Sequence, residues 1–347
     1  MVDCLINKPS FGVFDRVTMR LLLYAFGFLS IAGSAPAMAE QLRPEIEIFI
    51  GEMVARHGFE QDELENIFGG VQFQPAIIDA MSRPATSRPW HEFRPIFINP
   101  QRIAGGVDFW NSHVATLERA RRESGIPEEI ITAVIGVETT YGARIGKHRV
   151  LDALTTLAFD YPRRAAFFRG ELEQYLLLGR EQGADILNIR GSYAGAIGIP
   201  QFMPSSYRRY AVDFDGDGKV DLAGSTADAI GSVANYLKSF GWETGGTVVV
   251  PAMVNGENYR SILFAGSKPL HTVEEIRKLG VMTRADIPHD HPATLLEMAN
   301  NGGNEYWLGF NNFFVITRYN RSVHYAMAVW QLAEEIRAAR NSGLQQK

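Results

Sequence analysis

The chain has 347 residues, 46% of them hydrophobic, and carries a formal net charge of −5 at pH 7. This length allows about two domains, or one domain with an insertion, and the composition supports a buried core rather than long disordered segments. The mild negative charge and the lack of a basic stripe argue against nucleic acid as a partner.

Residues 1–39 are predicted to be an export signal and not part of the fold. Two arginines precede the apolar run from Leu21 to Leu29, and Ala37-Met38-Ala39 supplies the small residues of a cleavage site. The run is too short for a comfortable membrane span, so we expect cleavage before Glu40, with an uncleaved anchor as the alternative. The single cysteine, Cys4, lies upstream of the run, so the exported chain is expected to contain neither a disulfide nor a lipid anchor.

The exported chain is predicted to be mainly helical as far as residue 244. Apolar periodicity and helix start and stop signals predict helices over residues 43–57, 62–68, 75–81, 107–124, 127–142, 150–159, 163–182, 204–211 and 226–240, with a last one over 322–340. A connector rich in Pro, Arg and Ser covers residues 82–89, and the aromatic-rich segment 90–98 is expected to be irregular.

The pattern changes between residues 245 and 312. Strands are predicted over residues 247–254, 258–265, 306–310 and 313–317, with a two-residue hairpin turn at 311–312 and a short helix over 272–279. We interpret this segment as a small α/β insertion at 245–312. A helical core would then be formed by residues 40–244 and 313–347, so the predicted fold class is mainly α (α+β).

Glu138 is the most informative residue, because it lies in an almost wholly apolar helix predicted over residues 127–142. It shares one helix face with three apolar side chains, those of Ile131, Val134 and Ile135. Burial and the negative end of the helix dipole both disfavour ionisation, so the carboxyl group is expected to keep its proton near neutral pH, as a general acid must. The alternative is a carboxylate at a helix end that pairs with Arg144 or Lys147.

A second motif begins at Asp213 and matches the start of an EF-hand calcium loop. Aspartates stand at loop positions 1, 3, 5 and 9, a glycine at position 6 and the carbonyl of Lys219 at position 7. Position 12 is Gly224 instead of Glu, so Asp228 is the nearest candidate for the closing carboxylate. We favour a structural calcium site over an Asp/Gly-rich turn that binds nothing, because close aspartates repel one another without a cation.

Three further segments carry weaker signals. The glycine-rich stretch 191–204 contains Gln201, whose amide suits an N-acetyl group or a hydroxyl, although a packing loop is the alternative. Asn320 or Ser322 could cap the last helix. Residues 289–291 (His-Asp-His) could bind a metal, but an ordinary loop is favoured.

Together, these segments resemble the membrane-bound lytic murein transglycosylase B family. The resemblance covers nearly all of residues 43–340 and is carried by 134–139, 161–164, 170–173, 195–207, the loop that starts at Asp213, 229–236 and 319–328. It implies a lysozyme-like helical core with a small α/β insertion. It also implies cleavage of the β-1,4 bond between N-acetylmuramic acid and N-acetylglucosamine of peptidoglycan without water, which leaves a 1,6-anhydro ring on the muramic acid.

The same resemblance assigns roles to individual residues. Glu138 would be the single acid/base of a substrate-assisted reaction. The saccharide would contact Ser192, Gln201, Tyr236, Tyr319, Asn320 and Tyr325, and calcium would bind Asp213, Asp215, Asp217, Asp228 and the carbonyl of Lys219. The protein would act as a periplasmic monomer on glycan strands, with no cofactor needed for the chemistry and no membrane anchor in the exported chain.

Two departures and two alternatives stay open. Phe93 and Phe167 stand where some members have tyrosines, so hydroxyl contacts at these positions are in doubt. A hydrolytic muramidase would need a second carboxylate, such as Glu171 or Glu173. The other alternative is a calcium-dependent glycan-binding protein without catalytic activity.

Overall fold

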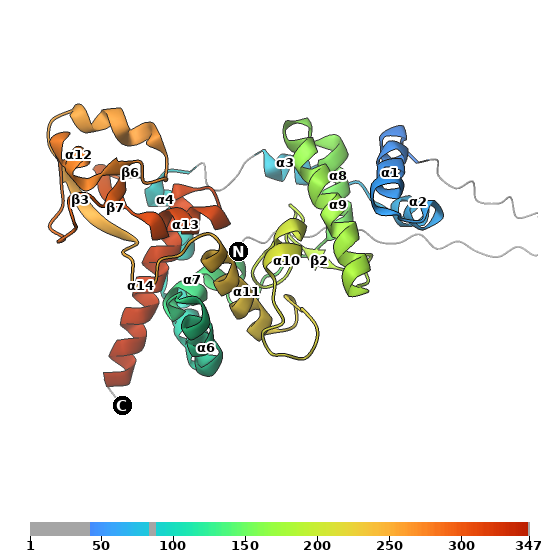
Figure 1. Ribbon diagram of the computed structural model, residues 1–347, viewed down its shortest axis with the longest axis horizontal. Coiled ribbons are helices and arrows are strands. Elements are labelled where there is room, and N and C mark those ends of the chain that lie inside the picture. The colour runs from blue at the N-terminus through green and yellow to red at the C-terminus, as the bar shows by residue number, and fades with distance from the viewer. Residues whose placement is uncertain (1–41, 83–87, 346–347) are drawn as a thin grey trace, which may run out of the picture. The chain divides into compact units, whose positions relative to one another are not determined.

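The computed structural model describes residues 42–82 and 88–345, so the predicted export signal and most of the 82–89 connector lie outside the described residues. The described part is mainly helical and carries a small antiparallel sheet, as predicted (Figure 1). None of the helices in this part is long and apolar enough to cross a membrane.

The first helices form where they were predicted. They are α1 (Pro44–His57), α2 (Gln61–Gly69) and α3 (Pro75–Met81). Pro44 occupies the first turn of α1, and Gly58 ends the helix in a left-handed conformation, with φ 62°. α3 contacts α8 (Val150–Asp160), and α8 packs along α9 (Ala165–Gln182), which follows the short 3₁₀ helix η2 (Pro162–Arg164).

The centre of the fold is α7 (Glu128–Thr139), which is contacted by four other helices. These are α5 (Pro100–Ser112), α6 (Val114–Ser124), α11 (Thr226–Ser239) and α14 (Val323–Gln345). α14 lies alongside α7 in Figure 1. Because neighbours surround it, the residues from Ile130 to Val137 and Thr139 are buried, which explains why this helix is apolar on every side.

Two predictions in the first half of the core are wrong. The segment expected to be irregular is a helix, α4 (Trp90–Phe97), because Trp90, Phe93 and Phe97 recur at helical spacing and the first two are buried. The helix predicted over 107–124 is two helices, α5 and α6, separated by His113 in a non-helical conformation. Asn111, Ser112 and His113 are all weak helix formers, which allows the break at this point.

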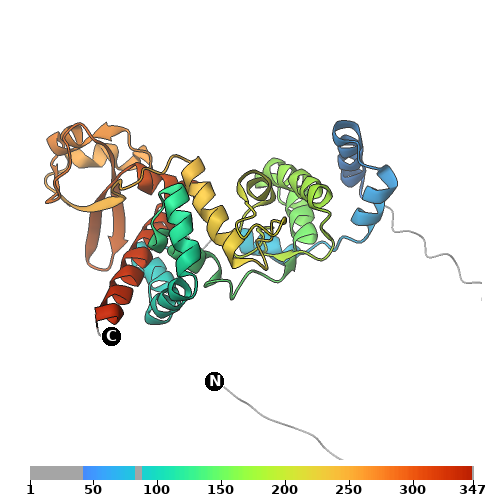
Figure 2. The ribbon, with the colours of Figure 1, turned by 60° about the horizontal axis from the view of Figure 1, so that its bottom comes forward.

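Residues 249–310 contain a five-stranded antiparallel sheet with strand order β4-β6-β7-β3-β5. Its strands are β3 (Val249–Val254), β4 (His271–Thr272), β5 (Val281–Met282), β6 (Pro292–Asn300) and β7 (Gly303–Gly309). The sheet lies to one side of the helices, where β6 contacts α4 and β7 contacts α13 (Figure 2). It shares a separate hydrophobic core with α12 (Val273–Lys278). This helix agrees with the one predicted over residues 272–279.

Several strand predictions in this region are wrong. Residues Asn258–Ala265 form the 3₁₀ helix η3, and 313–317 belong to α13 (Asn311–Tyr319), so the turn expected at 311–312 is a helix start. A short apolar run cannot distinguish a strand from a buried helix, and Phe313, Val315 and Ile316 are all buried. β6 was not predicted. The chain from Leu42 onward forms one compact unit, so the predicted boundaries of the insertion remain a prediction.

Candidate active site

Glu138 lies in the last turn of α7, and that helix ends earlier than predicted. Thr140 and Tyr141 take left-handed backbone angles, with φ 53° and 61°, so the chain turns before Gly142. The Tyr141 hydroxyl donates to the carbonyl of Arg102 at 2.7 Å and fixes the turn against α5. The ring of Tyr141 lies so close to Gly136 that a Cβ there would be 2.6 Å from it, so only glycine fits at that position.

Thr139 joins the end of α7 to the glycine-rich segment. Its hydroxyl is fully buried, donates to the carbonyl of Ile199 at 2.8 Å and accepts the backbone N–H of Gly142 at 3.0 Å. The sequence reasoning did not single out this residue, because its hydroxyl donates to a carbonyl 60 residues away in the chain and no local pattern indicates such a contact.

The carboxyl group of Glu138 has one hydrogen-bond partner among the described residues. The Tyr325 hydroxyl, from α14, donates to Oε1 at 2.6 Å. Burial raises the pKa of Glu138 to about 7, and the hydrogen bond from Tyr325 opposes that shift without cancelling it. Across the described ranges, neither Arg144 nor Lys147 forms an ion pair with Glu138, so the predicted alternative does not occur there.

Three tyrosines from separate helices stack beside this carboxyl group. The rings of Tyr319 and Tyr325 are nearly parallel, with centroids 6.4 Å apart, and the Tyr236 ring lies 4.9 Å from that of Tyr319. The Tyr319 hydroxyl donates to the carbonyl of Pro200 and the Tyr236 hydroxyl to that of Arg318, each at 2.6 Å. Burial raises the pKa of each of the three phenols, so all three stay protonated donors at neutral pH.

The glycine-rich segment begins at β2 (Arg190–Gly191), which pairs with β1 (His148–Arg149), and leads into α10 (Pro204–Tyr210). Gln201 has φ 54°, and its amide nitrogen donates to the carbonyls of Ile145 and Gly198 at 3.0 and 2.8 Å. The Ser192 hydroxyl accepts two backbone N–H groups of its own loop. Both side chains therefore form hydrogen bonds with the backbone that hold the loop, and neither hydrogen-bonds to Glu138.

The glycines of this segment serve packing, which was the alternative reading of the sequence. A Cβ at Gly191 would meet the carbonyl of Ala196, one at Gly195 the side chain of Leu154, and one at Gly198 the carbonyl of Leu222 at 2.4 Å. Asn320 follows α13 directly and is exposed, next to Tyr319. The structure therefore brings together Glu138, Tyr325, Tyr319, Tyr236 and the segment 191–204, with Asn320 at the edge.

Neither candidate for a second catalytic carboxylate is free to act. Glu171 is buried and accepts the backbone N–H and the hydroxyl of Ser205 at 2.9 and 2.7 Å, which holds the start of α10. Glu173 pairs with Arg56 and His57 of α1, at 3.1 and 2.6 Å. Among the described hydrogen bonds, none joins either residue to Glu138.

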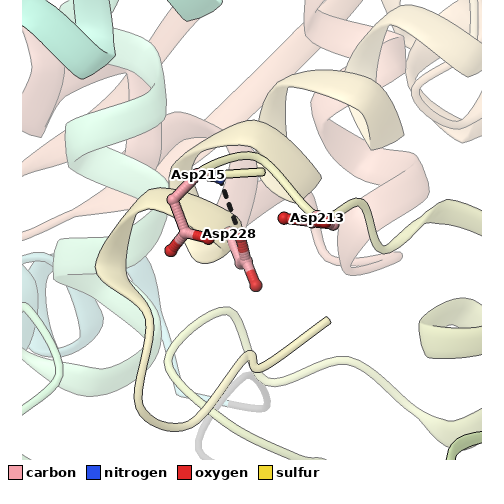
Figure 3. Close-up of side chains that lie close together, drawn as sticks. All are labelled: Asp213, Asp215 and Asp228. Carbon is pink, nitrogen blue, oxygen red and sulfur yellow. Dashed lines mark hydrogen bonds between the residues drawn. The ribbon is translucent and has the colours of Figure 1, made fainter. Parts of the chain in front are cut away.

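The EF-hand-like segment brings three carboxylates together (Figure 3). One oxygen each of Asp213, Asp215 and Asp228 lies within 4.8 Å of the others, and Asp228 is only 1% exposed in the first turn of α11. Asp217 is not part of this cluster; its Oδ1 accepts the N–H of Lys219 at 2.8 Å. Asp221, at loop position 9, likewise accepts backbone N–H groups of its own turn.

The backbone also donates to these carboxylates. Asp228 accepts the N–H groups of Phe214 at 2.7 Å and Asp221 at 2.8 Å, and Asp213 accepts that of Gly216 at 2.7 Å. Three acidic groups at this separation, with backbone donors around them, form a donor set of hard oxygens that suits Ca²⁺. The prediction that Asp228 approaches the start of the loop agrees with this arrangement.

Comparison with known proteins agrees with the fold and with this site. The transglycosylase SLT domain family matches residues 41–334. The chain therefore belongs to this family, as a lytic transglycosylase.

Its relatives are also named lytic transglycosylases. The chain is 44% identical over 307 residues to membrane-bound lytic murein transglycosylase B of Escherichia coli, with 86% of this chain and 84% of the relative covered. Soluble lytic transglycosylase SltB1 from Pseudomonas aeruginosa has a similar structure, with a TM-score of 0.81, 51% identity, and coverage of 86% of this chain and 100% of SltB1. These likenesses confirm the predicted family and the predicted helical core with a small sheet.

Two further solved structures contain bound groups. Slt35 from Escherichia coli, in complex with calcium, matches with a TM-score of 0.79 and 43% identity, over 86% of this chain and 94% of Slt35. SltB3 from Pseudomonas aeruginosa, in complex with NAG-anhNAM-pentapeptide, matches with a TM-score of 0.74 and 31% identity, over 84% and 79% of the two chains.

Proposed function

We propose that the protein cleaves the β-1,4 bond between N-acetylmuramic acid and N-acetylglucosamine of peptidoglycan, with Glu138 as the only acid/base. The observation that carries this proposal is a carboxyl group whose pKa is raised to about 7 and which has one hydrogen-bond donor, Tyr325, among the described residues. Such a group is about half protonated at neutral pH, so it can give a proton in one step and take one in the next.

The reaction needs no second carboxylate if the substrate supplies the nucleophile. Protonated Glu138 gives its proton to the glycosidic oxygen while the C1–O bond of the muramic acid breaks. The carbonyl oxygen of the 2-acetamido group attacks C1 and forms an oxazolinium ion. The Glu138 carboxylate then removes the proton of the C6 hydroxyl, whose oxygen bonds to C1 and releases the acetamido group. The product is the 1,6-anhydro sugar, and Glu138 is protonated again.

The surrounding residues would hold the sugar and the carboxyl group. Because Tyr325 donates to Oε1, the proton of Glu138 is placed on Oε2 and can face the substrate. The amide oxygen of exposed Asn320 would accept the N–H of the acetamido or oxazolinium group. Gln201 keeps its amide oxygen for the glycan since its nitrogen bonds the backbone, and Ser192, Tyr236 and Tyr319 shape the same surface.

The ion and the setting belong to this proposal as well. Ca²⁺ would bind Asp213, Asp215 and Asp228 as a structural ion, while Asp217 and the carbonyl of Lys219 remain predicted ligands. The calcium in Slt35 supports this assignment. The protein would work in the periplasm as a monomer on glycan strands, after removal of residues 1–39, and its chemistry would need no cofactor.

Digestion of purified sacculi tests the function. The wild-type protein is expected to release muropeptides with 1,6-anhydromuramic ends, which mass spectrometry recognises because they lack one water. Glu138→Gln should lower turnover by at least about a thousandfold, since proton transfer in both steps depends on this group. Hydrated products would instead support the hydrolytic alternative, and an active Glu138→Gln variant would exclude Glu138 as the acid/base.

A further inference from the structure

A polar cavity lies next to the start of the proposed glycan-binding segment 191–204. It has a volume of about 470 Å³ and is bordered by the β1–β2 pair and by the segment before α3. Every lining residue is polar or charged, among them Gln72, Gln74, Lys147, Arg149, Asp152 and Arg190. A cavity lined by polar and charged residues suits a hydrated, charged group rather than a hydrophobic ligand.

The charge in this cavity is positive. Its one acidic lining residue, Asp152, is already paired with Arg149 at 2.7 Å and accepts the backbone N–H of Gln72 at 3.0 Å. Lys147 and Arg190 are exposed, and neither forms an ion pair within residues 42–82 and 88–345. Two cations beside a neutralised aspartate attract an anion.

The pairing of β1 with β2 places Lys147 and Arg190 close together. β1 and β2 pair in antiparallel register, and the Arg190 guanidinium donates to the carbonyl of Lys147 at 3.1 Å. The strands approach so closely that a Cβ at Gly146 would lie 2.0 Å from the carbonyl oxygen of Gly191. The backbone therefore keeps the two residues close together, so both side chains can reach the same anion.

The cavity is also tied to the loop that contains Ser192 and Gln201. Ser192 lies two residues after Arg190, and the Gln201 amide donates to the carbonyl of Ile145, two residues before Lys147. A glycan strand on that loop would carry its peptide close to this cavity. The peptide in NAG-anhNAM-pentapeptide, the compound bound to SltB3, has carboxylate groups.

We propose that Lys147 and Arg190 bind a carboxylate of the peptide attached to the muramic acid, so that the enzyme prefers strands that still carry their peptides. This inference rests on the proposed function, which it extends from the glycan to the peptide.

Kinetics with two substrates test the inference. One substrate is peptidoglycan strands with their peptides, and the other is the same strands stripped by an amidase, which leaves only the lactyl carboxylate. The Lys147→Ala/Arg190→Ala double variant is expected to lose about tenfold in kcat/KM on strands with peptides, mainly through KM, and less than about twofold on stripped strands. The charge-keeping variant Lys147→Arg/Arg190→Lys should stay close to wild type.

A matched control removes two exposed positive charges elsewhere. Arg277→Ala/Lys278→Ala, on α12, should leave both substrates unaffected. An equal loss on both substrates, a loss on neither, or a loss on stripped strands alone would each overturn the inference. If wild-type protein produces no anhydro ends from either substrate, the proposed function fails instead.

Calorimetry distinguishes a failure of this inference from a failure of the proposed function. Titration of NAG-NAM-pentapeptide and of NAG-NAM into the Glu138→Gln protein measures binding without turnover. The peptide should strengthen binding about tenfold, and this gain should vanish when Lys147→Ala and Arg190→Ala are added. Equal affinities for the two compounds, or a peptide effect that survives both substitutions, would contradict the inference whatever the enzyme's activity.

Discussion

At the scale of a single residue, the burial of Glu138 suits catalysis but lowers the stability of the folded protein. Burial raises its pKa from 4.5 to about 7 in the folded protein. The folded state therefore holds this proton more tightly than the unfolded chain does. As the pH rises from the unfolded value to the folded value, the unfolded chain ionises freely while the folded protein resists, so stability falls over that window and then levels off.

Glu138→Gln should therefore stabilise the protein at alkaline pH. Glutamine carries no charge, so the variant should gain about 3 kcal/mol over wild type between pH 4 and pH 8, because each pKa unit is worth about 1.4 kcal/mol. Urea titrations of both proteins at several pH values give this difference, and the other titrating groups cancel in it. A difference in unfolding free energy that stays constant with pH would contradict the raised pKa.

At the scale of elements, the site depends on how α7 is joined to the segment 191–204. Thr139 makes that joint with two hydrogen bonds, to the Ile199 carbonyl and from the Gly142 N–H. Thr132, on the same helix, is equally buried, but its hydroxyl has no hydrogen-bond partner in the described part of the chain. The two threonines thus form a matched pair, and we expect their substitution to have opposite effects on the free energy of unfolding.

Thr139→Val should lower the free energy of unfolding by about 1–3 kcal/mol, because it leaves the buried carbonyl of Ile199 and the part-buried N–H of Gly142 unpaired. Thr132→Val should be neutral or stabilising, since it removes a polar group that burial left unsatisfied. Chemical denaturation of both variants measures the two effects. Equal losses would mean that the hydroxyl of Thr139 contributes nothing beyond its volume.

Several helices and the apolar environment of Glu138 could be predicted from the sequence because their signals are local. α1, α3, α8 and α10 begin and end within a residue or two of the predicted bounds. The β6–β7 hairpin was not predicted, although Asn301-Gly302 between its strands is a strong turn signal. The 3₁₀ helix η3 and the pairing of Tyr325 with Glu138 depend on contacts between distant segments, which no short pattern contains.

At the scale of the whole molecule, the carboxylate cluster joins the loop after α10 to the start of α11, and α11 packs against the core. Asp228 anchors the start of α11, and α11 in turn contacts α7 and carries Tyr236. An ion bound at this cluster would stabilise the folded protein alone, because the unfolded chain does not hold the three carboxylates together.

Calcium should therefore raise the free energy of unfolding by about 2.7 kcal/mol when its concentration is a hundredfold above its Kd. Asp215→Asn, which removes one charge of the cluster, should abolish most of this gain. Asp221→Asn is the matched control in the same loop and should keep it, since Asp221 lies outside the cluster and is not among the predicted ligands. Thermal denaturation with and without calcium gives both results, and identical curves for wild-type protein would remove the ion from the proposal.

One backbone hydrogen bond links the EF-hand-like segment to the segment next to Glu138. The N–H of Ile199, in the segment next to Glu138, donates to the carbonyl of Leu222, in the EF-hand-like segment, at 2.7 Å. Displacement of either segment strains the other, so ion occupancy and saccharide affinity become thermodynamically linked. Linkage is reciprocal: whatever factor calcium contributes to glycan binding, bound glycan returns to calcium binding. Removal of calcium by a chelator would then weaken the binding of the glycan.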